Sequence, residues 1–250
     1  MPMDNNAFIY GTRAVIEALH AGQTIDRIWI QKGLSNALYH ELRQALKGKQ
    51  IPIQTVPVEK LQRLGSKNHQ GVVAALAEIH YQDVFQIVQQ VFEQGQSPLV
   101  LVLDQITDVR NFGAIARSAL CAGVNALLIP SKGAAQINSD AIKTSAGALH
   151  HLPVCRVPYI DEALKQLKAS GLSIVACHEK TSQTLYSSKL TGPLALLLGS
   201  EDKGISPAYL KYCDAEIAIP MKGPLASLNV SVAAGIVLFE RLRQTAAAEF

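Results

Sequence analysis

Three polar stretches stand out because each follows an apolar run with the character of a strand. Residues 99–104 lead into Q-I-T-D-V-R-N-F-G, residues 194–198 into G-S-E-D-K-G-I, and residues 216–219 into P-M-K-G-P-L-A-S-L-N-V-S. Ligands of parallel sheets bind at the carboxyl ends of the strands, so we expect chemistry at these three places. The groups that they and the next helix supply are an arginine, two amides, a carboxylate and a hydroxyl, from Arg117, Asn111, Asn229, Glu201 and Ser227.

Each of these residues also has an ordinary structural explanation. A carboxylate after a buried strand is costly unless it is paired, which makes Glu201 a candidate partner for Arg117 or Lys203, although it could simply open a loop. Arg117 could be a salt-bridged surface arginine, and Asn111 could form a turn. Ser227 and Asn229 precede a predicted helix and could be its N-caps. The residue types alone leave both explanations open.

The common nucleotide and metal motifs are missing from the sequence. No two glycines are separated by a single residue, which excludes the G-x-G-x-x-G fingerprint. Gly199 and Gly204 have the spacing of a phosphate-binding loop, but Ile205 follows where lysine is required. The four cysteines form no C-x-x-C pair, so we expect no metal site and interpret them as reduced core residues.

The apolar patterns predict an α/β fold with two parts. In residues 98–250, predicted strands at 99–104, 126–129, 154–157, 172–177, 194–198 and 216–219 alternate with helices at 113–122, 140–147, 161–169 and 230–243. This alternation is typical of a mostly parallel sheet. The first 76 residues predict a small α/β unit, with strands at 25–30, 51–58 and 72–76 and a helix at 36–46, and a glutamine-rich helix at 81–95 would connect the two parts.

Charge is divided unevenly along the chain. The net charge of +3 arises from +4 in residues 1–75, −3 in residues 76–97 and +2 in residues 98–250, and residues 43–67 carry six bases against one acid. Such a basic stretch can meet the phosphates of a nucleic acid or can be a solvated helix face. No segment has the roughly 20 apolar residues of a membrane-spanning helix, and the first ten residues lack the apolar core of a secretory signal, so we expect a cytoplasmic protein.

Taken together, the motifs resemble those of a known family. N-F-G-A-I-A-R, L-G-S-E-D-K-G-I and I-P-M-K-G-P-L-A-S-L-N-V-S-V-A-A-G resemble, in order and spacing, the three motifs of the SpoU (TrmH) family of RNA ribose 2′-O-methyltransferases. F-I-Y-G-T-R-A-V-I-E-A-L and N-H-Q-G-V resemble the substrate-binding domain of the RlmB type, the subgroup that methylates a guanosine of large-subunit (23S) ribosomal RNA.

The resemblance implies a fold and a reaction. The expected fold is a C-terminal sheet with a trefoil knot, which binds S-adenosylmethionine without a metal, in a homodimer whose subunits share the site. The expected reaction is ribose 2′-O-methylation of a 23S rRNA guanosine; a transfer-RNA methyltransferase and a non-catalytic RNA-binding ribosome-assembly protein are the alternatives. The implied domains are an RNA-binding domain at 1–76, a linker helix at 77–97 and a methyltransferase domain at 98–250.

The resemblance also implies residue roles. Arg117 would contact the target ribose and phosphate, Asn111 would hold the loop and Arg117 in place, and Glu201, Ser227 and Asn229 would line the active site. Backbone contacts of Gly199, Ile219 and Leu228 would surround the adenosyl group of the cofactor. In the N-terminal domain, where phosphate contacts and base stacking would bind RNA, the candidate residues are Arg13, Lys67, His69 and Gln70.

Overall fold

The computed structural model describes residues 8–65, 68–224 and 227–246. The chain divides after His80 into two compact units. The first unit holds a four-stranded mixed sheet in the order β1-β4-β2-β3, in which β2 pairs with β3 in parallel and the other pairs are antiparallel. Its elements are β1 (Phe8–Tyr10), α1 (Thr12–His20), β2 (Ile25–Gln31), α2 (Ala37–Ala45), β3 (Ile53–Val56), α3 (Val58–Leu64) and β4 (Val72–Leu76).

Helices cover both faces of this small sheet. Apolar residues of α1 and α2 pack on one face, and Leu61 of α3 packs on the other beside Trp29. Trp29 is buried, and its indole N–H donates to Oε1 of Gln54. Asn36 caps α2, because its side chain accepts the backbone N–H of Tyr39. The sequence analysis predicted neither β1 nor α3, which have three and seven residues, too few to establish a period. It also missed α1, although the buried Val15, Ile16 and Leu19 recur at helical spacing.

The second unit holds a seven-stranded sheet in the order β11-β9-β10-β6-β7-β8-β5, and each neighbouring pair is parallel. The α/β class and the parallel C-terminal sheet predicted from the sequence are confirmed. Its strands and longer helices are β5 (Tyr81–Gln82), α4 (Val84–Glu93), β6 (Leu99–Asp104), α5 (Val109–Cys121), β7 (Ala126–Pro130), α6 (Ser139–Thr144), β8 (Val154–Val157), α7 (Ile160–Ala169), β9 (Ser173–Cys177), β10 (Leu194–Gly199), α8 (Pro207–Leu210), β11 (Ala215–Ile217) and α9 (Val230–Ala246). Two short 3-10 turns are η1 (Ala148–His150) and η2 (Leu185–Ser187).

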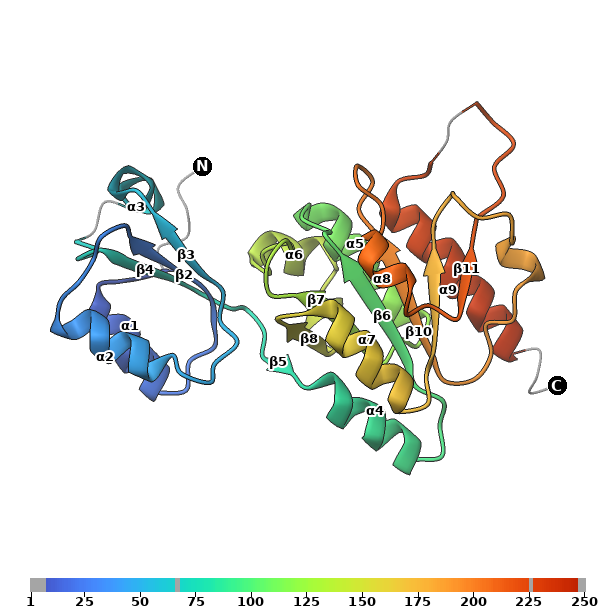
Figure 1. Ribbon diagram of the computed structural model, residues 1–250, viewed down its shortest axis with the longest axis horizontal. Coiled ribbons are helices and arrows are strands. Elements are labelled where there is room, and N and C mark those ends of the chain that lie inside the picture. Colours follow the sequence, from blue (N-terminus) through green and yellow to red (C-terminus); the bar gives the residue numbers. More distant parts are fainter. Residues whose placement is uncertain (1–7, 66–67, 225–226, 247–250) are drawn as a thin grey trace. The chain divides into compact units, whose positions relative to one another are not determined.

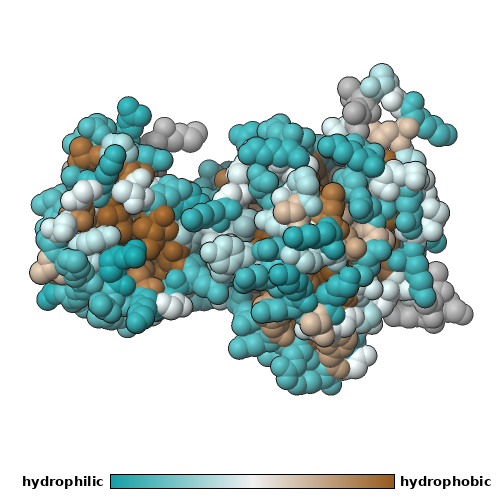
Figure 2. Space-filling model, viewed as in Figure 1, coloured by the Kyte–Doolittle hydropathy of each residue, from teal (hydrophilic) through white to brown (hydrophobic). Residues whose placement is uncertain are grey.

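The sheet lies between two helical layers (Figure 1). Helices α4 and α7, with α8, pack on one face, whereas α5 and α9 lie against each other on the opposite side. Every residue of β6 is buried, as its continuous apolar sequence predicted. In the view of Figure 2, hydrophilic residues cover most of the visible surface of this unit. Because the central strands are buried between the two helical layers, they form a rigid base for the loops at their ends.

The predicted linker helix, 77–97, holds β5 and α4, and α4 buries Val84, Ile87 and Val88 in the core of the second unit, because its apolar residues recur on one helical face. One expectation about the cysteines is corrected. The cysteines are not all core residues. Cys155 and Cys177 are buried, Cys213 is partly buried and Cys121, at the end of α5, is exposed. No helix in the described part of the chain could cross a membrane.

The end of α9 is fixed by a buried carboxylate. Glu240 accepts two hydrogen bonds from the Arg243 guanidinium, at 2.7 and 2.8 Å, and one from the Gln244 amide at 2.9 Å. The Gln244 side chain also accepts the N–H of Leu190 and donates to the carbonyl of Ser188. The Arg243 and Gln244 hydrogen bonds lower the pKa of Glu240 from 4.5 to about 2. This cluster holds the 188–190 loop against α9.

Glu240→Gln should therefore destabilise the protein in a pH-dependent way. A carboxylate whose pKa is lowered on folding stabilises the native state fully above its unfolded value and loses that contribution as pH falls through its folded value. We expect the variant to melt about 2–4 °C lower than the parent at pH 7. The difference should narrow as pH falls from 4.5 towards 2. Thermal melts from pH 7 to pH 3 measure it, and a constant difference over that range would contradict this role.

Candidate active site

The loops after β6, β10 and β11 meet at one edge of the seven-stranded sheet. Nδ2 of Asn229 donates to Oδ1 of Asn111 at 3.0 Å and to Oε1 of Glu201 at 2.6 Å, and Nδ2 of Asn111 donates to the same carboxylate oxygen at 3.3 Å. Three residues that are 28 to 118 positions apart in sequence are thus joined in one hydrogen-bonded cluster. All three keep solvent access, so a ligand can reach them.

Glu201 lies at the N-terminus of α9, where it also accepts the backbone N–H of Val230 at 2.9 Å. A helix N-terminus stabilises a carboxylate through its free N–H groups and its dipole. This contact corrects the expectation that Glu201 pairs with Arg117 or Lys203: its described partners are Asn111, Asn229 and the helix end. Its second oxygen, Oε2, makes no hydrogen bond to any residue within the described ranges and can accept one from a ligand.

Asn229 is the N-cap of α9 and a member of the cluster at the same time. Its Oδ1 accepts the backbone N–H and the hydroxyl of Ser231, at 3.0 and 2.6 Å, so it caps the first turn of α9. Its Nδ2 at the same time holds Glu201 and Asn111. Asn111 lies in the first turn of α5, where its backbone N–H is capped by Asp108. The cluster therefore joins the starts of two helices to the loop after β10.

A tight turn at residues 199–204 shapes the space beside this cluster. Gly199 ends β10, and a Cβ atom added to it would lie 2.1 Å from the carbonyl carbon of Gly204 and 2.3 Å from the backbone nitrogen of Ile205. The backbone N–H of Gly204 returns to the carbonyl of Ser200 at 2.8 Å, and Gly204 has a φ of +66°. Only glycine allows so close an approach of two backbone segments.

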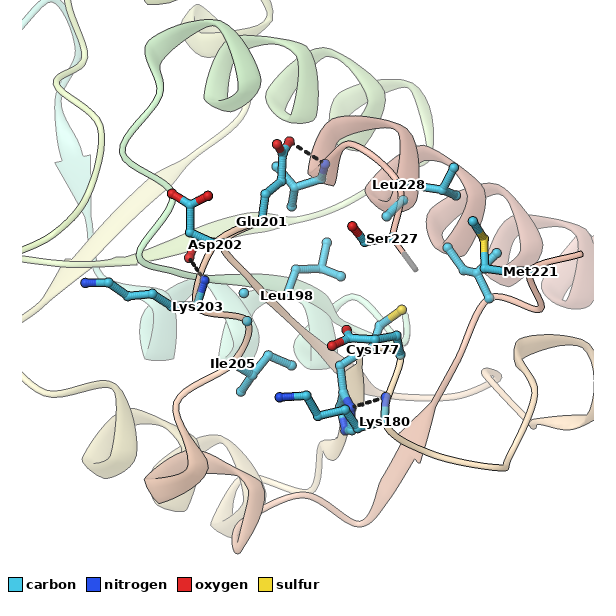
Figure 3. Close-up of a pocket in the computed structure, with 18 residues that line it drawn as sticks. Cys177, Lys180, Leu198, Glu201, Asp202, Lys203, Ile205, Met221, Ser227 and Leu228 are labelled. Carbon is cyan, nitrogen blue, oxygen red and sulfur yellow. Dashed lines mark hydrogen bonds between the residues drawn. The ribbon is translucent and has the colours of Figure 1, made fainter. Parts of the chain in front are cut away.

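A pocket of about 230 Å³ opens at these strand ends. Its walls include Gly199, Ile219 and Leu228, predicted to hold the cofactor, together with Glu201 and Ser227. Figure 3 shows Glu201, Ser227 and Leu228 on one side, Cys177, Lys180 and Ile205 on the other, and Leu198 between them. The pocket thus combines aliphatic walls with a polar rim, which suits a ligand that is partly apolar and partly charged.

The sequence analysis missed one wall of this pocket, formed by residues 177–180 after β9. Nδ1 of His178 accepts the N–H of Lys180 at 3.1 Å, while its Nε2 lies 2.7 Å from a Glu216 oxygen, so the imidazole fixes this turn. Burial and the nearby Glu179 carboxylate raise the pKa of the Cys177 thiol to about 12, which keeps it neutral and unreactive. The rule about strand ends could have found this wall, because H-E-K follows a predicted strand.

Arg117 lies away from the cluster. It is exposed on α5, lines no part of the pocket and makes no hydrogen bond or ion pair to any residue that the structure describes. The six positions between Asn111 and Arg117 turn α5 by about 600°, so the two side chains leave the helix in directions about 120° apart. The alternative explanation, that Arg117 is a salt-bridged surface arginine, is therefore wrong. Its guanidinium is available to bind an anion.

The RNA-binding candidates of the first unit occupy two places. Arg13 is exposed on α1, and its guanidinium lies 3.5 Å from Glu41 and 3.8 Å from Glu17. Nδ1 of His69 accepts the N–H of Gly71, which is a structural role, and Gln70 is exposed with a φ of +46°. Lys67 lies outside the described residues. The structure therefore brings His69 and Gln70 together in one turn before β4.

A parallel α/β sheet with a pocket at its carboxyl edge is the arrangement of a ligand-binding α/β enzyme. The family model of the SpoU rRNA methylase family matches residues 98–239, and the model for RNA 2′-O ribose methyltransferase substrate binding matches residues 8–82. The chain belongs to the SpoU rRNA methylase family: it is an RNA 2′-O-ribose methyltransferase with an N-terminal substrate-binding domain.

Relatives extend over nearly the whole chain. A Staphylococcus haemolyticus protein assigned to the TrmH family of tRNA/rRNA methyltransferases is 35% identical over 94% of this chain and 95% of its own length. Bacillus subtilis YacO, assigned to the same family, is 32% identical over 95% of both chains. The crystal structure of the SpoU methyltransferase AviRb from Streptomyces viridochromogenes, in complex with AdoMet, covers 96% of this chain and 90% of AviRb with a TM-score of 0.61 and 26% identity.

Proposed function

We propose that the protein transfers a methyl group from S-adenosylmethionine to the ribose 2′-hydroxyl of a guanosine in large-subunit (23S) rRNA, as the RlmB type does. The observation that carries the proposal is the cluster of Asn111, Glu201 and Asn229 at the rim of the pocket. Groups for orienting a hydroxyl thus lie beside a space for the methyl donor. AviRb, which shares this fold, binds AdoMet.

The residues of the pocket fit this cofactor. Ile219, Leu228, Leu198 and Ile205 offer apolar surfaces for an adenine ring, and the tight turn at Gly199 exposes backbone groups for contacts to the adenosyl group. When bound, S-adenosylmethionine supplies a methyl group already activated by the positive charge of its sulfonium. The protein therefore needs no metal for this step; its task is to orient the hydroxyl and to manage one proton.

Glu201 and Arg117 would divide that task. Oε2 of Glu201 is free to accept a hydrogen bond from the target hydroxyl, and the Asn111 and Asn229 amides fix the carboxylate in place. Arg117 would bind the ribose and its phosphate; a guanidinium is effectively never deprotonated, so it is not the base. The new oxygen–methyl bond forms as the carbon–sulfur bond breaks, and the hydroxyl proton leaves to the RNA phosphate or to water. Ser227, on the pocket wall, would contact the substrate or cofactor.

The N-terminal unit would select the RNA. We assign RNA binding to residues 1–76 through Arg13, Lys67, His69 and Gln70, and methyl transfer to residues 98–250. The support is the excess positive charge of the first 75 residues and the match of residues 8–82 to the substrate-binding family model. This extra domain favours a ribosomal over a transfer-RNA substrate. The free Arg117 and the intact cluster argue against a non-catalytic assembly protein.

We also propose a homodimer through α5 and α9, in which each active site receives Arg117 from the partner copy. Val232 and Phe239 of α9 are each 49% exposed, and the partly buried Ile236 lies between them on the same helical face. Leu120 of the adjoining α5 is 36% exposed. An apolar stripe of this kind on a helix needs a covering surface. This dimer would explain why Arg117 points away from the cluster of its own subunit, because the residue would act in the other subunit's pocket.

The dimer predicts a clear result by sedimentation. At micromolar concentration the parent should sediment at about twice the 26.9 kDa mass of one chain, and Phe239→Glu should sediment as a monomer because it buries a charge in the interface. The control is Phe92→Glu, since Phe92 is 38% exposed on α4, on the opposite side of the sheet. A parent mass near that of one chain refutes the dimer.

The substrate is tested with purified protein and radiolabelled S-adenosylmethionine. Deproteinised large-subunit rRNA from cells lacking the protein should accept one methyl group on a guanosine ribose, whereas total tRNA from the same cells should accept none. Nuclease digestion and chromatography identify the modified nucleoside. Transfer to tRNA alone would replace the ribosomal assignment by the transfer-RNA alternative.

A further inference from the structure

The carboxyl edge of the sheet continues beyond the active-site cluster, across the ends of β7 and β8. Neighbouring parallel strands lie about 4.8 Å apart, so the end of β8 is about 10 Å from that of β6. Hydrogen bonds fix the intervening loop: the Ala135 N–H donates to the Ile106 carbonyl and the Ser131 N–H to the Val157 carbonyl, both at 2.7 Å. These two hydrogen bonds therefore hold residues 131–133 in a fixed place beside the loop that leads to Asn111.

Three exposed side chains without a described hydrogen-bonding or ionic partner lie after these three strands. Lys132 lies two positions after β7 and Tyr159 two positions after β8, whereas Arg110 lies in the first turn of α5, six positions after β6 and next to Asn111. All three are exposed, Tyr159 at 63%, which is more than any other large hydrophobic side chain in the described ranges. None of the three forms a hydrogen bond or an ion pair with a residue of the described ranges.

Two cations followed by an aromatic ring suit single-stranded RNA. Cationic side chains bind the phosphates, and an exposed ring stacks on a base of any sequence. A single exposed tyrosine would need no explanation, but here it extends a row of cations that begins at the active site. Asp161 and Glu162, in the first turn of α7, would repel a phosphate near Tyr159. The contact at Tyr159 is therefore with the face of a base, and the phosphate contact is at Lys132.

We propose that the nucleotides next to the methylated one lie across the ends of β7 and β8, with a phosphate on Lys132 and a base stacked on Tyr159. The span of about 10 Å accommodates roughly three stacked nucleotides at about 3.4 Å each. This inference rests on the proposed function, in that RNA is the substrate. It adds a contact surface in the catalytic unit to the one assigned to the N-terminal unit.

The test compares variants of the full chain on deproteinised large-subunit rRNA. Tyr159→Ala should raise the KM for RNA about tenfold with little change in kcat, because a lost stack weakens binding, and Tyr159→Phe should behave as the parent. The matched control is Tyr186→Ala, since Tyr186 is 61% exposed in η2, and it should have no effect. The affinity for S-adenosylhomocysteine should be the same in all of them.

Salt dependence separates the two contacts. Lys132→Ala should reduce the slope of log affinity against log salt by about 0.7, the value for one phosphate of a single strand, whereas Tyr159→Ala should leave the slope unchanged. A parental KM for Tyr159→Ala, an equal loss for Tyr186→Ala, or an unchanged slope for Lys132→Ala overturns the inference.

A readout without turnover distinguishes this inference from the proposed function. Large-subunit rRNA should slow backbone hydrogen exchange at residues 131–134 and 159–162 but not at residues 185–187, which contain the control tyrosine. Protection without methyl transfer by the parent would reject the proposed reaction and retain the RNA path. Transfer without protection would reject the path and retain the reaction.

Discussion

Arg117→Ala should reduce methyl transfer about 1,000-fold and leave folding and cofactor binding unchanged. Removing a preorganised group that binds developing or fixed charge in a transition state costs about 10²–10³ in kcat. Arg117 is exposed and has no partner within the described ranges, so its truncation should change the free energy of unfolding by less than about 0.5 kcal/mol. Single-turnover transfer to rRNA measures the loss, and calorimetry with S-adenosylhomocysteine measures cofactor affinity.

Two further variants test whether the loss of activity is specific to the guanidinium of Arg117. Arg117→Lys should also fail, because an ammonium cannot supply the planar fork of a bidentate contact. Arg43→Ala is the matched control, since Arg43 is an exposed arginine of α2 in the other unit. It belongs to the basic stretch assigned to RNA binding, so its loss should act on the KM for RNA alone and leave the rate at saturating RNA at the parental value. If Arg117→Ala turned over as fast as the parent, the residue would have no catalytic role.

Gly199→Ala should abolish cofactor binding. The added methyl group would meet backbone atoms of Gly204 and Ile205 at 2.1 to 2.3 Å, and these cannot move aside as a side chain could. Opening the turn would move Glu201 and the pocket wall, so we expect an affinity loss of at least about 100-fold, and overpacking should lower stability by about 1–3 kcal/mol. Titration with S-adenosylhomocysteine measures the affinity.

The control for this variant is Gly223→Ala. Gly223 lies in the loop after β11, its backbone does not have a positive φ, and no atom of the residues that the structure describes lies within 4 Å of an added Cβ. It should therefore bind the cofactor as the parent does. Normal binding by Gly199→Ala would show that the turn does not shape the cofactor site.

The sequence predicted well those features that local patterns encode. The buried strand β6 and the helix α9 were recognisable because an apolar run and a helical period are local signals. The sequence also led us to expect Asn111, Glu201 and Asn229 close together, because strand ends in a parallel sheet converge, and the structure joins them by hydrogen bonds. Their part in catalysis stays a prediction. The family assignment from the three motifs is confirmed by the family models and relatives.

Long-range pairing explains what the sequence could not predict. Glu201 bonds to the amides and the helix end rather than to an arginine, since only the fold reveals that the start of α9 lies beside the loop after β10. The strand β5 has only two residues, and its pairing with β8 assigns α4 to the second unit. The outward direction of Arg117 depends on α5 beginning at Val109, before the helix predicted from 113. The trefoil knot stays a prediction of the resemblance.

Mapping ribose methylation across ribosomal and transfer RNA tests the central claim most directly. The RNA is taken from cells that lack the protein, cells that regain it, and cells that regain Arg117→Ala. One 2′-O-methylguanosine in 23S rRNA should be absent in the first, restored in the second and absent in the third. An unchanged 23S rRNA pattern across the three strains would contradict the account.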